Sequence, residues 1–68
     1  MNDETFNLTI RQFLKRFGIT AQREIERAVR AGLADGKLAG NEKLPVRATL
    51  AIPGVLEELV IEGVVELE

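Results

Sequence analysis

The sequence predicts an α+β fold, in which two N-terminal helices pack on a C-terminal antiparallel β-hairpin. Up to Leu33, apolar residues recur every three or four positions, which is the spacing of an amphipathic helix. After Pro45 the apolar period changes to two, which is the spacing of a half-buried strand. The chain has 68 residues, of which 46% are hydrophobic, so we expect one small domain over residues 1–68.

The first predicted helix begins after Asn2 or Asp3, either of which can cap it. An apolar stripe follows, and it contains every aromatic residue of the protein: Phe6, Ile10, Phe13, Leu14 and Phe17. Gly18 is placed where it can end this helix. Because phenylalanine has no polar group, we interpret the stripe as core and not as a cofactor pocket.

The second predicted helix covers residues 21–35. Thr20 can cap it, and Ile19 can pack back on it as a hydrophobic staple. Its apolar side is formed by Ile25, Ala28, Val29 and Leu33. Gly36 follows the last apolar turn and can adopt the left-handed conformation that ends helices.

Arg23, Arg27 and Arg30 fall on the opposite side of this second helix. The favoured interpretation is a solvated face, on which Glu24 and Glu26 balance the arginines. The alternative is a cationic ridge that contacts nucleic acid, because a helix, a glycine turn and a second helix also form the helix–turn–helix motif. In that alternative the protein is a winged helix-turn-helix-like module with the hairpin as its wing.

Residues 37–45 are predicted to form a loop, with Leu38 as an optional short third strand. Four apolar residues then alternate with other residues as one strand: Val46, Ala48, Leu50 and Ile52. Pro53 and Gly54 are typical of a turn. Residues 55–62 fit either a short helix or a strand, and the β-branched residues after Leu59 favour the strand.

An isolated hairpin is marginally stable and has two open edges. Val60, Glu62 and Val64 are predicted to lie on its outward face, where two valines replace the polar residues that a monomer would favour. We therefore take these three residues as a candidate interaction surface, through which a second copy of the chain could bind.

The residue inventory argues against an enzyme. The chain has no histidine, cysteine, tyrosine, tryptophan or serine, so most nucleophiles, general bases and transition-metal ligands are missing. The paired carboxylates Glu57 with Glu58 and Glu24 with Glu26 stand in no recognised motif. We expect no catalytic residues, no cofactor and no metal site.

Charge and hydropathy suggest a cytoplasmic protein with no membrane span and no signal peptide. The net charge is −2, divided into +2 over residues 1–44 and −4 over residues 45–68. The acidic C-terminal part would repel phosphate, which weakens the nucleic-acid alternative. The expected function is a non-enzymatic protein–protein interaction module whose partner is an unknown protein or a second copy.

Three segments carry a resemblance to a known family: QREIE (22–26), GNEKLPV (40–46) and EGVVELE (62–68). With the sequence between them, they are similar to a family of short bacterial proteins known only as a domain of unknown function. The resemblance covers essentially the whole chain. It implies a bacterial protein and assigns no activity and no functional residue.

Overall fold

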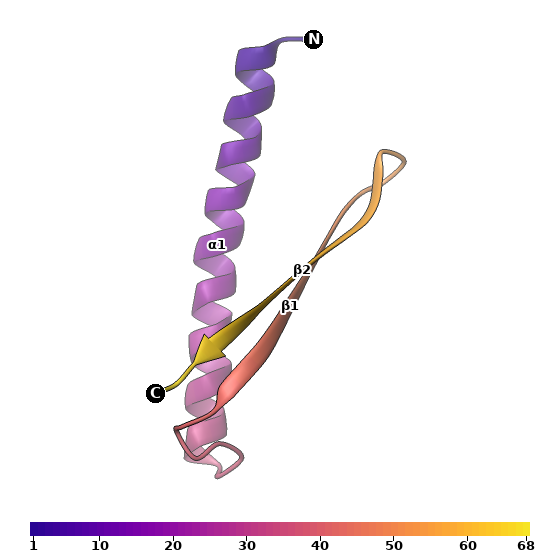
Figure 1. The fold of residues 1–68 in the computed structure, drawn as a ribbon. Coiled ribbons are helices and arrows are strands. Elements are labelled where there is room, and N and C mark those ends of the chain that lie inside the picture. The colour runs from indigo at the N-terminus through magenta and orange to yellow at the C-terminus, as the bar shows by residue number, and fades with distance from the viewer. The chain divides into compact units, whose positions relative to one another are not determined.

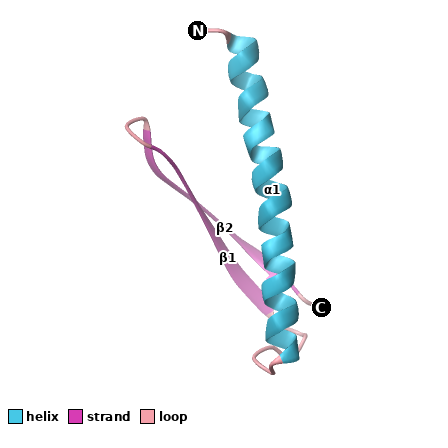
Figure 2. Cartoon of the chain, turned by 180° about the vertical axis from the view of Figure 1, so that it is seen from behind, coloured by secondary structure: helices cyan, strands magenta, loops and turns pink.

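The computed structural model describes residues 1–68 and confirms the α+β class. It contains one helix, α1 (Asp3–Ala34), followed by two strands, β1 (Lys43–Ile52) and β2 (Leu56–Glu66) (Figures 1 and 2). The chain divides into two compact units, residues 1–37 with the helix and residues 38–68 with the hairpin. Each unit is described by itself.

Both ends of α1 lie where the sequence predicts a helix boundary. The side chain of Asn2 accepts a hydrogen bond from the backbone N–H of Thr5 at 3.0 Å and so satisfies one of the free donors of the first turn. At the other end, the N–H of Asp35 donates to the carbonyl of Ala31 at 3.0 Å, and Gly36 follows with a φ of 85°. That positive φ is the left-handed conformation expected after a helix.

The prediction of two helices is wrong, because α1 runs without a break through Gly18, Ile19 and Thr20 (Figure 1). Glycine inside a helix costs about 1 kcal/mol relative to alanine. A break would leave four N–H groups and four carbonyls without helical partners, and the hydroxyl of Thr20 could satisfy only one of them. Continuing the helix is therefore the less costly arrangement.

The two strands form an antiparallel hairpin that twists along its length (Figure 1). Residues 55–62, which fit either a helix or a strand in the sequence, belong to the turn and to β2. The proposed third strand near Leu38 is absent, since the sheet has two strands and Leu38 lies in the loop before β1. The backbone N–H groups of Ala39 and Gly40, which follow Leu38, donate to the carboxylate of Glu42 and are therefore not free to pair with a strand.

The tip of the hairpin is a tight turn at Pro53 and Gly54. The N–H of Val55 donates to the carbonyl of Ile52 at 2.9 Å, and Gly54 has a φ of 80°. Proline followed by a residue with positive φ is the pattern of a type II turn. Next to the turn, pairing shifts between Leu50–Leu59 and Ile52–Leu56, so β2 carries one extra residue as a bulge.

The loop before β1 is held by the carboxylate of Glu42. It accepts hydrogen bonds from the backbone N–H groups of Ala39 at 2.8 Å and Gly40 at 2.9 Å. These donors, with Ala39 the stronger, lower the pKa of Glu42 because they stabilise its charged form. The carbonyl of Glu42 also accepts from the N–H of Leu67 at 3.0 Å, which joins this loop to the C-terminal end of the hairpin.

Candidate interaction surface

The predicted surface residues Val60, Glu62 and Val64 share one face of the hairpin, as their alternation indicated. They pair across the strands with Thr49, Arg47 and Pro45, in that order. Arg47 Nε lies 4.0 Å from Glu62 Oε1, while Val60 and Val64 are 43% and 62% exposed. This outward face therefore combines an exposed ion pair with two exposed valines, and its role in binding stays a prediction.

The opposite face of the hairpin has no charged residue along the paired strands. Four cross-strand pairs form it: Leu44 with Val65, Val46 with Gly63, Ala48 with Ile61, and Leu50 with Leu59. Ile61 is 60% exposed and Leu59 is 43% exposed. The sequence assigned these residues to the inward face, and their pairing confirms that they share it.

Arg23, Arg27 and Arg30 lie on one side of α1, since residues three, four and seven apart are neighbours on a helix. Arg27 forms an ion pair with Glu24 at 3.2 Å, and both side chains are well exposed. The turn between two helices, on which the helix–turn–helix hypothesis depends, is absent. The arginines therefore stand on a straight helix, and nucleic-acid contact by them stays an untested alternative.

Local contacts account for one of the two carboxylate pairs. Glu24 binds Arg27, and Glu26 accepts a hydrogen bond from the side-chain amide of Gln22 at 3.0 Å. Glu57 and Glu58 lie in β2 at the bulge. No group of three histidine, cysteine or acidic residues in the chain is arranged to hold a metal ion.

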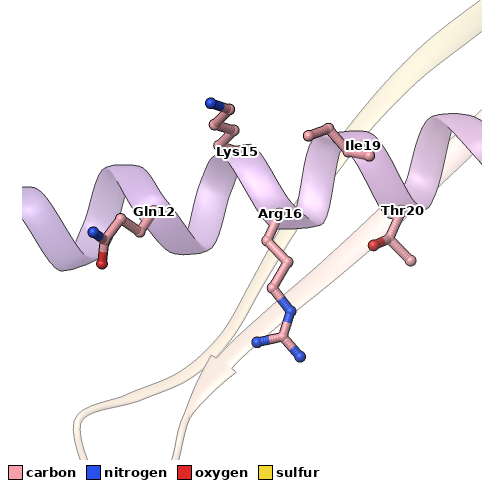
Figure 3. A pocket seen from close by; sticks show the side chains of 5 residues that line it. All are labelled: Gln12, Lys15, Arg16, Ile19 and Thr20. Atoms are coloured by element: carbon pink, nitrogen blue, oxygen red, sulfur yellow. The ribbon is translucent and has the colours of Figure 1, made fainter.

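The depressions of the surface are shallow and open. One lies on α1 between Gln12, Lys15, Arg16, Ile19 and Thr20. Figure 3 shows Lys15 and Arg16 pointing to opposite sides of the helix, so these polar groups do not converge on a common point. A second lies across the hairpin at Arg47 and Glu62. Neither combines an enclosed volume with converging polar groups, as ligand sites usually do.

The most extensive apolar feature is a stripe along the whole of α1, which the two-helix interpretation divided at Gly18. Its spacing is four, four and three residues, repeated every eleven: Phe6, Ile10, Leu14, Phe17, Ala21, Ile25, Ala28 and Gly32. We call these eight residues the α1 stripe. Phe13 lies beside it, with its ring 6.4 Å from that of Phe17. A search for periodicity across the glycine would have found the repeat.

Five of the eight residues of the α1 stripe are exposed, whereas Ala21 and Ile25 are half-buried and Gly32 is buried. Phe6, Leu14 and Phe17 are 49%, 51% and 46% exposed. No hydrophobic side chain of the chain is buried, and fifteen large ones are exposed. No helix combines the length and apolar character needed to cross a membrane. The large exposed surfaces of this protein are thus the stripe and the two hairpin faces.

Comparison with known families gives one match. The model of a family of unknown function (DUF6494) matches residues 1–68. The chain belongs to this family. The family assignment confirms the resemblance seen in QREIE, GNEKLPV and EGVVELE, and it brings no activity with it. No curated protein and no solved structure matches the chain.

Proposed function

We propose that this family member is a small non-enzymatic interaction module that associates with itself. The observation that carries the proposal is the absence of any buried hydrophobic side chain, together with fifteen large hydrophobic side chains that remain exposed. Folding depends mainly on removing apolar surface from water. A chain that leaves this much of it exposed gains stability by covering it with another molecule.

The hairpin supports the same proposal. A two-stranded hairpin is marginal in water, and here each strand has an unpaired edge. Val60, Glu62 and Val64 present two exposed apolar side chains on either side of an ion pair. We propose that this strip takes part in the contact, in a bacterial, cytoplasmic homodimer.

The test is the molar mass in solution, measured by light scattering over a range of concentrations. A dimer is expected at high micromolar concentration. A strict monomer at about 1 mM would refute the proposal, because a Kd above about 1 mM does not describe a specific association.

Val64→Lys probes the hairpin strip and is expected to weaken the dimer. Val55→Lys is the matched control, because Val55 lies at the turn and is 81% exposed, against 62% for Val64. If the two variants dimerised equally well, the strip Val60, Glu62 and Val64 would not be part of the interface.

A further inference from the structure

We infer that the α1 stripe is a homodimerisation surface, on which a second copy of the chain packs its own α1 in antiparallel orientation. This inference rests on the proposed self-association and adds its site and geometry. An eleven-residue repeat keeps one face of nearly straight helices in register, because 3.67 residues per turn is close to the 3.6 of an α-helix. The stripe keeps that repeat over eight consecutive positions.

The sizes of the side chains select the antiparallel orientation. The first half of the stripe is bulky, with Phe6, Ile10, Leu14 and Phe17, whereas three of the four residues of the second half, Ala21, Ala28 and Gly32, are small. When two copies of α1 are paired about residue 19, three of the four bulky residues of the first half meet small ones, while Leu14 lies opposite Glu24. Phe6 lies opposite Gly32, Ile10 opposite Ala28, and Phe17 opposite Ala21. A parallel pair would place Phe6 against Phe6 and Gly32 against Gly32, which leaves one end overfilled and the other empty.

The exposed area is sufficient for a dimer. A phenylalanine can bury about 200 Å², and the three rings are 46–53% exposed, so each leaves roughly 100 Å² uncovered. With Ile10 and Leu14, the five large side chains expose roughly 450 Å² per helix, or about 900 Å² over two copies. The smaller residues of the stripe bring this to the ~1,000 Å² that a specific interface needs.

The decisive experiment measures distances between spin labels in the dimer. The chain has no cysteine, so Thr5→Cys and Ile19→Cys each give a single labelled site. Both positions lie on the side of α1 away from the stripe. For the antiparallel pair we expect about 20–25 Å between the two labels at residue 19 and about 40–50 Å between those at residue 5, from the rise and width of a helix. Short distances at both sites would show a parallel pair and overturn the inference.

A matched pair of variants locates the contact. Leu14→Lys places a charge on the stripe, while Leu8→Lys places it on the opposite side, and the two leucines are similarly exposed at 51% and 54%. Leu14→Lys is expected to weaken dimerisation at least about tenfold, and Leu8→Lys to leave it unchanged. A dimer that resists Leu14→Lys would overturn the inference while the proposed function stands. A protein that is monomeric at every concentration would overturn both.

Discussion

Gly18 and Gly36 give a sharp test of the fold, because the same substitution at the two positions should have opposite effects. At either position an added Cβ would meet no atom within 4 Å. The two glycines differ in backbone conformation. Gly18 is inside α1, whereas Gly36 has a φ of 85°. Gly18→Ala should stabilise the protein by about 0.8–1 kcal/mol, the difference in helix propensity. Gly36→Ala should destabilise it by about 1–2 kcal/mol, the cost of a left-handed alanine.

Thermal unfolding followed by circular dichroism measures both effects. In a domain of this size, 1 kcal/mol shifts Tm by about 4–8 °C, so Gly18→Ala should raise Tm by about that amount and Gly36→Ala should lower it by at least as much. The three proteins are compared at one concentration, because association changes the apparent stability. If Gly18→Ala lowered Tm, or both variants shifted Tm in the same direction, the continuous helix through Gly18 would be refuted.

Three further substitutions test single contacts. Asn2→Ala removes the helix cap and should cost about 1 kcal/mol in urea unfolding; an unchanged midpoint would contradict the cap. The backbone N–H of Ala39 is the main cause that lowers the pKa of Glu42 below its ordinary value. The charged carboxylate therefore stabilises the fold at a pH above the ordinary pKa, and this stabilisation is lost as the pH falls through the lowered pKa. An NMR titration should therefore place the pKa of its carboxyl below the ordinary value for glutamate, and Glu42→Gln should reduce the loss of stability in acid. Arg47→Ala breaks an exposed ion pair and should change the unfolding free energy by less than about 1 kcal/mol; a larger loss would show that the pair is buried by a partner.

Features that depend on a few neighbouring residues could be predicted from the sequence. The cap at Asn2 and the helix end before Gly36 each follow from the chemistry of one residue. The two faces of the hairpin follow from alternation, because a strand fixes the side of each residue once one is assigned. The candidate strip Val60, Glu62 and Val64 could be placed on one face for this reason, although its partner could not be named.

The choice between one helix and two could not be predicted in the same way. Gly18, Ile19 and Thr20 contain a stop signal, a staple and a cap, and each of them fits a turn. They also fit the middle of a helix at a cost of about 1 kcal/mol. The outcome depends on the hydrogen bonds that the whole helix keeps, which is a cooperative property that no single residue reveals.

This single change alters where the function is to be found. Two short helices joined at Gly18 could fold back and cover each other's apolar sides, and the phenylalanines would then be core. A continuous helix cannot cover its own side, and Phe6, Phe13 and Phe17 are left 46–53% exposed. The residues that the sequence assigned to the interior are therefore the ones most in need of a partner. In the antiparallel dimer that we propose, Phe6, Ile10 and Phe17 of one helix would lie opposite Gly32, Ala28 and Ala21 of the other, so a second copy of the same helix would cover them without any other protein.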